Sequence, residues 1–370
     1  MSHLFTPFAL GPLQLANRIV VAPMCQYSAD DGSASDWHPM HLGQLAISGA
    51  GLLVIEATAV ESIGRITPGC LGLYNDANEQ ALAQVLANVR RHSPMPIAMQ
   101  LAHAGRKGSS EVPWRGGALI AAEQGGWQPV APSALPHADG EAPPLALDDS
   151  GLARVRQAFV DAAQRAVRLG LDAIELHSAH GYLLHQFLSP IANRRSDAYG
   201  GSLQARMRFP LEVFEAVRAA VPASMPLGVR LSAIDWVDDG WDLEQSVAYG
   251  RALRQRGCSY LHVSSGGVSP LQKIAAAPGY QVPFAQRLRD EVGLPTIAVG
   301  LITEAAQAEV IIASGQADLV AMARALLYNP RWPWHAAAQL GAQVIAPPQY
   351  WRCQPRGQGK LFGDARTGQR

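Results

Sequence analysis

The chain has 370 residues, and its 30 Lys and Arg balance 30 Asp and Glu, so the formal net charge at neutral pH is zero. This balance does not favour binding of nucleic acid through a basic surface. With 48% hydrophobic and 16% charged residues, the chain is too apolar to be disordered and can bury a large core. Closed α/β barrels of this length form one unit. We therefore expect a single domain over residues 1–370.

The start of the chain and its cysteines indicate a cytoplasmic protein that does not contact a membrane. Met1-Ser2-His3 begins a segment with no basic start and no long apolar run, and no stretch of about 18 apolar residues follows. The four cysteines, Cys25, Cys70, Cys258 and Cys353, form no Cys-x-x-Cys pair. This spacing favours neither a zinc site, nor an iron–sulfur cluster, nor a disulfide scaffold, and a reducing compartment is expected.

Short apolar runs of strand type alternate with amphipathic helical stretches along the whole chain, which is typical of βαβ units. Eight strands are predicted, at residues 19–24, 52–58, 97–102, 173–177, 227–232, 260–264, 296–299 and 319–323. The clearest helices are predicted at residues 151–169, 206–219, 242–256 and 303–313. Asp242 and Thr303 can each cap the start of a helix, and glycines follow several helix ends.

Eight strands with helical crossovers favour a (β/α)₈ TIM barrel, with a doubly wound open sheet as the alternative. Two long stretches, 106–149 and 182–201, interrupt the alternation of strands and helices after the third and fourth strands. In a barrel both lie on the carboxyl-terminal face, where insertions carry function. The residues before the first strand include Gly11-Pro12 and can form a hairpin that closes the barrel floor.

Polar residues lie where the predicted strands end. Each of them could have a structural role only, or a role in binding or catalysis. His177 and His180 have a spacing that suits metal ligands, but no third ligand is evident nearby, and a structural pair is the other reading. Cys25 is by default a small buried hydrophobe. Arg230 at the end of an apolar strand needs an anionic partner to offset desolvation.

The segment from His177 to Phe209 carries the longest motif of the chain. It reads HSAHGYLLHQFLSP, continues with NRRSDAYGGS and ends with RMRF. In these residues the chain strongly resembles the Old Yellow Enzyme family of flavin-dependent ene-reductases. Ala16-Asn17-Arg18, the run from Ala22 to Tyr27, the run from Gln100 to Lys107, and Val299-Gly300-Leu301-Ile302 extend the resemblance over almost the whole chain.

Cys25 and the sequence Arg331-Trp332-Pro333 before a short tail are similar to the bacterial thermophilic-like class, which includes xenobiotic reductases. The larger dienoyl-CoA reductase relatives fit poorly, because no cluster-binding cysteine motif or second nucleotide domain follows. One departure is Ala205, where relatives usually carry Asn. We expect this difference to affect loop order more than chemistry.

The resemblance implies a tightly but non-covalently bound FMN across the barrel mouth, reduced by NADPH or NADH. Pro23, Met24, Cys25, Ala57 and Gln100 would meet the flavin ring. Arg230 would lie where negative charge accumulates on reduction. The phosphate would lie among Gly267, Gly300, Ala323 and Arg324.

The resemblance also implies how a small activated alkene is held and reduced. His177 and His180 would donate hydrogen bonds to its carbonyl or nitro oxygen, and Tyr182 would protonate the α-carbon after hydride transfer from flavin N5. Tyr27 would line the cavity and Cys25 would tune the flavin. Both substrates would use one site in turn, which predicts ping-pong kinetics.

The thermophilic-like class often shares its active sites across a dimer. Arg352 occupies the place of the arginine that reaches a neighbouring subunit, and Trp351 beside it is a second candidate lining residue. We therefore expect a homodimer or a higher oligomer in which the tail, residues 343–370, crosses the interface. The rival functions are a metal-dependent barrel hydrolase using His177 and His180, and a non-catalytic flavin-binding protein.

Overall fold

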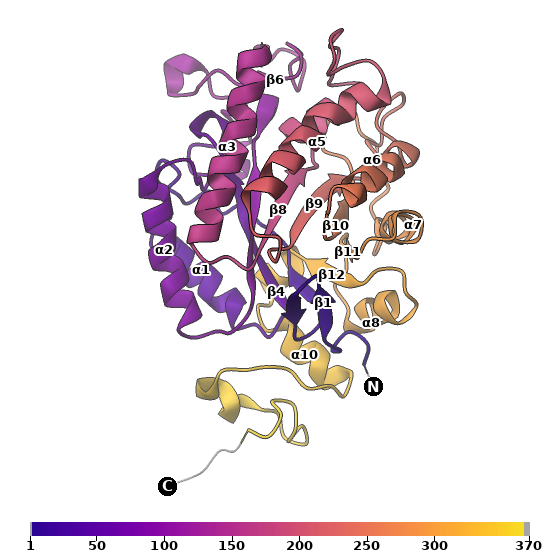
Figure 1. Cartoon of the computed structure of the whole chain (residues 1–370). Coiled ribbons are helices and arrows are strands. Elements are labelled where there is room, and N and C mark those ends of the chain that lie inside the picture. Colours follow the sequence, from indigo (N-terminus) through magenta and orange to yellow (C-terminus); the bar gives the residue numbers. More distant parts are fainter. Residues whose placement is uncertain (1, 366–370) are drawn as a thin grey trace.

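The computed structural model describes residues 2–365, which form a closed barrel of eight parallel strands surrounded by helices (Figure 1). The order around the barrel is β10-β11-β12-β3-β4-β5-β8-β9. The strands are β3 (Ile19–Val21), β4 (Leu52–Ala59), β5 (Ile97–Ala102), β8 (Ala173–Ser178), β9 (Leu227–Ser232), β10 (Leu261–Ser264), β11 (Thr296–Ala298) and β12 (Leu319–Met322). All are buried throughout, because helices cover their outer faces and side chains fill the barrel. The TIM-barrel prediction and all eight strands are confirmed.

Helices follow the strands and pack around the barrel. They are α1 (Trp37–Ala46), α2 (Asp76–Arg90), α3 (Asp149–Arg168), α4 (Leu183–Leu188), α5 (Leu203–Ala220), α6 (Leu243–Gln255), α7 (Val282–Val292), α8 (Ala305–Ala313), α9 (Arg324–Tyr328) and α10 (Trp332–Gln339). Asp242 caps α6 as predicted, by accepting the Gln245 N–H at 2.9 Å. The cap predicted at Thr303 is wrong, because α8 begins one residue later and its first flanking residue is Glu304, which makes no side-chain cap.

The amino-terminal residues close the barrel floor as expected. β1 (Phe8–Leu10) and β2 (Leu13–Leu15) form an antiparallel hairpin. Leu10 and Leu15 pack with Val20 and Leu52 in a buried apolar cluster at the start of the barrel strands. The hairpin therefore seals the end opposite to the strand carboxyl termini.

The two predicted insertions lie on the carboxyl-terminal face, at the top of Figure 1. The first contains the short helices η2 (Gly105–Lys107), η3 (Pro113–Arg115) and η4 (Ala122–Gln124) and the small sheet of β6 (Val130–Ala131) and β7 (Leu145–Ala146). The second contains α4 and is held by Asn193, whose amide donates to Phe187 O and Tyr199 O, each at 2.8 Å. Ala205 lies in α5, where its N–H donates to the Ser202 hydroxyl that caps the helix.

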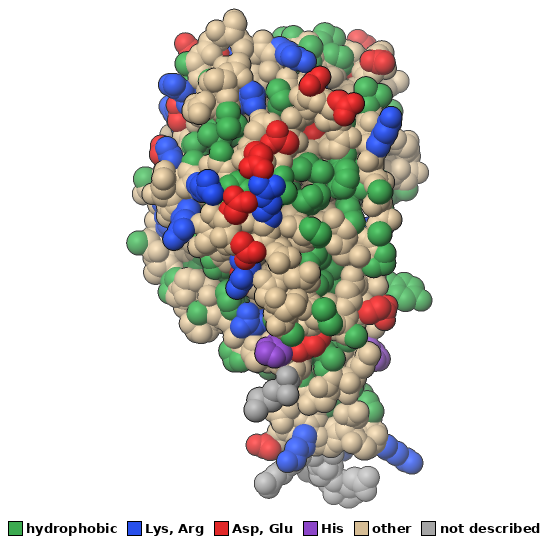
Figure 2. Space-filling model, turned by 90° about the vertical axis from the view of Figure 1, so that its right-hand side faces the viewer, with side chains coloured by type: hydrophobic (Ala, Val, Ile, Leu, Met, Phe, Trp, Pro, Cys, Tyr) green, Lys and Arg blue, Asp and Glu red, His purple; other side chains and the backbone are tan. Residues whose placement is uncertain are grey.

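The tail after α10 packs below the barrel floor and includes the short helix η5 (Pro348–Cys353) (Figure 1). It has a small core of its own, in which Val344, Leu361 and Phe362 pack against Trp334 of α10. Figure 2 shows the tail as a narrow projection, and on the face in view acidic and basic side chains are interspersed. Within the described residues, no helix is both long and apolar enough to span a bilayer.

Candidate active site

The carboxyl ends of the barrel strands bring most of the predicted site residues together at one mouth. Register pairs Ala57 of β4 with Gln100 of β5, and His177 of β8 with Arg230 of β9. Pro23, Met24 and Cys25 follow β3 directly, and Gly300 and Ala323 follow β11 and β12. Residues that are far apart in the sequence therefore share one edge of the barrel, as parallel strands require.

A bulge in β4 separates a structural carboxylate from the mouth. The register shifts between Ile55 and Ala57, which leaves Glu56 unpaired in the ladder. Glu56 accepts the Gln26 N–H at 3.0 Å, and its other oxygen lies 3.6 Å from His38 Nε2. The bulge therefore places Ala57 beside Gln100 while Glu56 holds the loop that carries Cys25.

A buried polar chain crosses the barrel interior below the mouth. Gln100 donates its amide N–H to Glu175 Oε1 at 2.7 Å, and His262 Nδ1 lies 3.0 Å from Glu175 Oε2. Burial alone would raise the pKa of Glu175, but His262, Arg230 and Gln100 together hold it below its usual value. Glu175 is thus an ionised carboxylate inside the barrel.

Arg230 is a buried cation with unused hydrogen-bonding capacity. The residue is 8% exposed, and its Nε has no hydrogen-bond partner within residues 2–365. Burial lowers the pKa of Arg230, while the Glu175 carboxylate acts in the opposite direction. The Nε–H of Arg230 therefore lacks an acceptor among the described residues and can donate to a bound group.

His177 and His180 lie against each other and are neutral. Ala179 N–H donates to His177 Nδ1 at 3.2 Å, which assigns the His177 proton to Nε2, 3.3 Å from His180 Nδ1. His180 Nε2 in turn lies 2.7 Å from Ser264 Oγ. Burial, followed by the charge of Arg230, holds the pKa of both rings well below the usual value.

Tyr182 stands at the edge of this pair. Its ring is 4.8 Å from the His177 ring in a T-shaped arrangement, and Lys107 Nζ lies 5.1 Å from its centroid. Burial raises the pKa of Tyr182 well above the usual value, which keeps the phenol protonated. Burial also lowers the pKa of Lys107 to about 8, an effect to which Arg106 adds.

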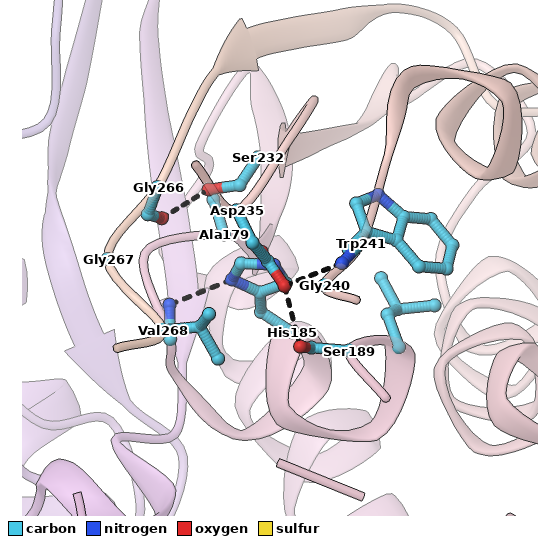
Figure 3. A network of polar contacts seen from close by, with 12 residues as sticks. Ala179, His185, Ser189, Ser232, Asp235, Gly240, Trp241, Gly266, Gly267 and Val268 are labelled. Atoms are coloured by element: carbon cyan, nitrogen blue, oxygen red, sulfur yellow. Dashed lines mark hydrogen bonds and ion pairs between the residues drawn. The ribbon is translucent and has the colours of Figure 1, made fainter. Parts of the chain in front are cut away.

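A buried carboxylate fixes the loop that carries His180 and Tyr182 (Figure 3). Asp235 accepts the Ser189 hydroxyl at 2.6 Å and the Trp241 N–H at 2.8 Å, and it lies 2.9 Å from His185 Nε2. His185 Nδ1 accepts the Gly181 N–H at 2.9 Å. Burial opposes ionisation of Asp235, but the His185, Ser189 and Trp241 contacts lower its pKa below the usual value.

The same loop lies in tight contact with the loop after β10. An added Cβ at Gly181 would stand 2.2 Å from Gly267 O, and one at Gly267 would stand 2.4 Å from His180 Cα. Both glycines also have positive φ. Lys107 Nζ joins the two loops by donating to His180 O and Gly267 O, each at 3.0 Å. Only glycine permits this approach of the two backbones.

A cavity of about 150 Å³ opens at the rim beside the last two strands and is lined by Gly300, Ala323 and Arg324. Gly267, which the resemblance grouped with these residues, does not line this cavity, and its N–H donates to Gln272 Oε1 at 2.6 Å. Tyr27 lines a separate cavity of about 180 Å³ together with Lys107 and His137.

Trp351 and Arg352 are the predicted residues that lie away from the mouth of their own chain. They belong to η5 below the barrel floor, and Trp351 Nε1 donates to Ala346 O at 3.0 Å (Figure 1). Within one chain they therefore do not meet His177 or Tyr182.

Sequence reasoning did not single out the residues that support the mouth. Glu175 and His262 were detectable, because each is a charged or titratable residue within a buried strand and Glu175 shares a strand face with His177. Asp235 gave no such signal, since it lies in a loop and finds its partners only through the closed barrel. Ser264 ends a predicted strand and Lys107 ends a motif of the resemblance, but the sequence assigned neither of them a role at the mouth.

Comparison with known proteins agrees with this site. The chain matches the NADH:flavin oxidoreductase / NADH oxidase family over residues 3–343. It is 44% identical over 351 residues to an NADPH dehydrogenase of Geobacillus thermodenitrificans, covering 94% of this chain and 98% of the relative. It is 40% identical over 375 residues to an NADH:flavin oxidoreductase of Gibberella zeae, covering 96% of this chain and 90% of the relative.

Among solved structures, morphinone reductase has a TM-score of 0.78 and 29% sequence identity, with 99% of this chain and 94% of that chain covered. A 2-naphthoyl-CoA reductase complex, at 22% identity, has a TM-score of 0.83 and covers 97% of this chain and 55% of that chain, which shows the shared fold. The chain therefore belongs to the NADH:flavin oxidoreductase / NADH oxidase family, and the resemblance to the Old Yellow Enzymes is confirmed.

Proposed function

We propose that this flavin-dependent oxidoreductase is an ene-reductase that reduces activated C=C bonds of enones, enals, maleimides or nitroalkenes. The observation that carries the proposal is the meeting of a neutral histidine pair, a protonated phenol and an arginine with an unused Nε–H at one mouth. Family membership favours this reading over a metal-dependent hydrolase. In the described chain no group of three or more His, Cys, Asp or Glu side chains is placed to hold a metal ion.

The chemistry of the mouth fits FMN, the family's cofactor. Arg230 has a buried Nε without a partner and suits the acceptor edge of the flavin pyrimidine ring. Gln100 uses its amide nitrogen on Glu175, so its amide oxygen is left to accept from the N–H group of the same pyrimidine ring. Gly300, Ala323 and Arg324 around the rim cavity suit a phosphate.

When bound, FMN supplies two-electron chemistry by accepting a hydride from NADPH or NADH and passing it to the alkene. In our proposal Pro23, Met24, Cys25 and Ala57 line the flavin ring. Arg230 stabilises the negative charge that develops at the ring, which makes reduction more favourable. Sequential use of one mouth by both substrates supports ping-pong kinetics.

His177 polarises the alkene by donating from Nε2 to its carbonyl or nitro oxygen, and His180 donates from Nδ1 in the tautomer whose Nε2 accepts the Ser264 hydroxyl. Their mutual contact is 3.3 Å, a long hydrogen bond with which an incoming oxygen acceptor can compete. Because both rings are neutral, they donate hydrogen bonds without transferring a full charge to the substrate. Tyr182, adjacent to His177, keeps its proton until the α-carbon of the polarised alkene requires it.

The remaining roles extend the proposal to the rim and to the tail. Tyr27 lines the substrate cavity and Cys25 tunes the flavin. Trp351 and Arg352 lie below the floor of their own barrel, so they reach a mouth only in a second copy of the chain. We therefore propose a homodimer of the xenobiotic reductase type in the cytoplasm, with Arg352 crossing the interface.

The proposal is tested by an anaerobic visible spectrum recorded before and after limiting NADPH, and again after 2-cyclohexenone. Flavin bands that bleach and then return establish both half-reactions. Bleaching without recovery would indicate a different electron acceptor, and a protein that takes up no FMN would remove the assignment. Flavin that does not bleach with NADPH or NADH would favour the non-catalytic flavin-binding alternative.

Two variants then separate the roles. Tyr182→Phe should slow reoxidation by the enone by about 10²-fold or more while sparing reduction by NADPH, as loss of a general acid predicts. The double change of His177 and His180 to Ala should weaken binding of a phenol to the oxidised enzyme. Tyr182→Phe with both half-reactions unchanged, or a double variant with unchanged phenol affinity, would contradict the corresponding role.

A further inference from the structure

Lys107 joins two loops at the mouth, but this task does not require its charge. Its Nζ donates to His180 O and to Gly267 O, each at 3.0 Å. An ammonium group has three N–H donors, and a neutral amine still has two. A neutral lysine could therefore hold both carbonyls, so the positive charge at this place calls for a second explanation.

The ammonium group lies beside the ring of Tyr182. Nζ is 5.1 Å from the ring centroid, which is within the range of about 6 Å over which an aromatic ring attracts a cation. Both acceptors of Lys107 are backbone carbonyls, and the backbones that carry them touch where an added Cβ at Gly181 would lie 2.2 Å from Gly267 O. The position of the cation relative to the ring is therefore fixed by the fold.

The proton-donor role of Tyr182 gives this position a chemical consequence. When Tyr182 protonates the α-carbon, its O–H bond breaks, a C–H bond forms, and the negative charge passes from the substrate to the phenolate oxygen. Burial raises the pKa of Tyr182 well above its usual value, so the phenolate is unfavourable at this site. A neighbouring cation stabilises the developing phenolate more than the neutral phenol, which lowers the barrier to proton transfer.

The groups around Lys107 make it the one expected to change charge just above neutral pH. They are Arg106 beside it in sequence, Tyr27, Glu111, His137 and Glu141 around a shared cavity of about 180 Å³, and the neutral histidine pair and Tyr182 at the mouth. Burial and the charge of Arg106 lower the pKa of Lys107 to about 8, whereas Glu141 acts in the opposite direction. His137 is already neutral, and burial keeps Tyr27 protonated by raising its pKa.

We propose that Lys107 is a positioning residue of alkene reduction, whose ammonium group stabilises the phenolate that Tyr182 becomes when it protonates the α-carbon. The inference rests on the proposed function, because it requires Tyr182 to be the proton donor. Solvent then returns a proton to the phenolate, and the ammonium group keeps its own. Loss of the charge of Lys107 would leave its bonds to both loops in place but would remove this stabilisation.

The first test uses the flavin-loaded parent protein and needs no substitution. The protein is reduced anaerobically, and its reoxidation by 2-cyclohexenone is followed by stopped-flow absorbance across the pH range. The rate constant should be level up to about pH 7 and fall about tenfold by about pH 9.5, as an ammonium group with a pKa of about 8 loses its proton. Reduction by NADPH does not use the Tyr182 proton and should show no such fall. A level reoxidation rate up to about pH 9.5 would overturn the proposal.

Substitutions of Lys107 then assign the pH dependence to this residue. Lys107→Arg keeps a positive charge over the whole range, so the alkaline fall should disappear. Lys107→Met should reduce the reoxidation rate about tenfold at about pH 7 and leave it independent of pH. Lys273→Met changes an exposed lysine of the loop after β10 and should keep the profile of the parent. An alkaline fall that persists in Lys107→Arg would belong to another group and would contradict the proposal.

The Tyr182→Phe background separates this inference from the proposed function. Adding Lys107→Met there should change the reoxidation rate by less than about twofold, because no phenolate forms. An equal loss from Lys107→Met in both backgrounds would mean that Lys107 only holds the loops, which overturns the inference and leaves the role of Tyr182 intact. Tyr182→Phe that does not slow reoxidation would instead contradict the proton-donor role itself, and the inference would fail with it.

Discussion

Glu175 is the residue that makes a buried Arg230 tolerable. It lies two residues before His177 on β8. Its carboxylate accepts a hydrogen bond from Gln100 and contacts His262, and these two residues lie on two other strands. A single carboxylate therefore balances the charge of the arginine and also orients the amide that faces the mouth. Loss of its charge would leave Arg230 without its nearest anionic counterpart.

At the residue scale we predict that Glu175→Gln raises the midpoint potential of the bound flavin. Removing a fixed negative charge from beneath the mouth favours a more negatively charged reduced flavin, so the potential should rise by about 30 mV or more, equivalent to about 1.4 kcal/mol for a two-electron couple. Potentiometric titration measures it. Glu215→Gln, on the surface beside Arg256, is the control. An unchanged or lower potential would show that Glu175 does not act on the flavin.

At the scale of elements, the loop between β8 and α4 depends on a carboxylate contributed by another segment. Asp235 follows β9, and it faces the Ser189 hydroxyl, the Trp241 N–H and His185. All three are donors, so an acceptor with two oxygens is required at this position. The orientation of Tyr182 therefore depends on a residue outside its own motif.

Asp235→Asn should destabilise the protein by about 1–3 kcal/mol, because the new amide N–H₂ would face donors and leave a buried group unpaired. Urea unfolding would show this as a lower midpoint with an unchanged slope. Asp238→Asn, an exposed neighbour, is the matched control and should leave the midpoint in place. Equal midpoints for both variants would mean that the network contributes little.

The strands and helix caps differ in how well the sequence predicts them. The strand positions could be predicted because each strand is a short apolar run. The Asp242 cap could be predicted because its partner is three residues away. Thr303 failed as a cap because the helix starts one residue later, a boundary that local pattern rarely resolves. The role of Asp235 could not be predicted, since its partners at 185, 189 and 241 come together only when the barrel closes.

For the whole molecule, buried neutral histidines set the response to acid. Burial lowers the pKa of His41 and of His137 to about 4, and it holds His177 and His180 well below 6.5. In the unfolded chain these rings regain pKa values near 6.5. Between the two values the unfolded chain binds more protons, so its free energy falls relative to the folded protein.

We therefore predict that the free energy of unfolding is nearly constant from about pH 7 to about pH 7.5 and falls as the pH drops from about 6.5 toward about 4.5, by up to about 1.4 kcal/mol per pH unit for each such histidine. Urea midpoints at pH 7.5, about 6.5 and about 5.5, at fixed ionic strength, measure it. His41→Gln should flatten the profile relative to the parent. Midpoints that do not move over this range would show that the rings are protonated in the folded protein.

The hairpin of β1 and β2 and the described end of the tail both lie below the barrel floor, opposite the mouth (Figure 1). A protein attached to a solid support through its amino-terminal end would therefore present its mouth outward, toward the bulk solution. Diffusion of small reactants to the mouth would then be unobstructed by the support. Attachment at this end would thus orient the enzyme on the support without a change in any loop.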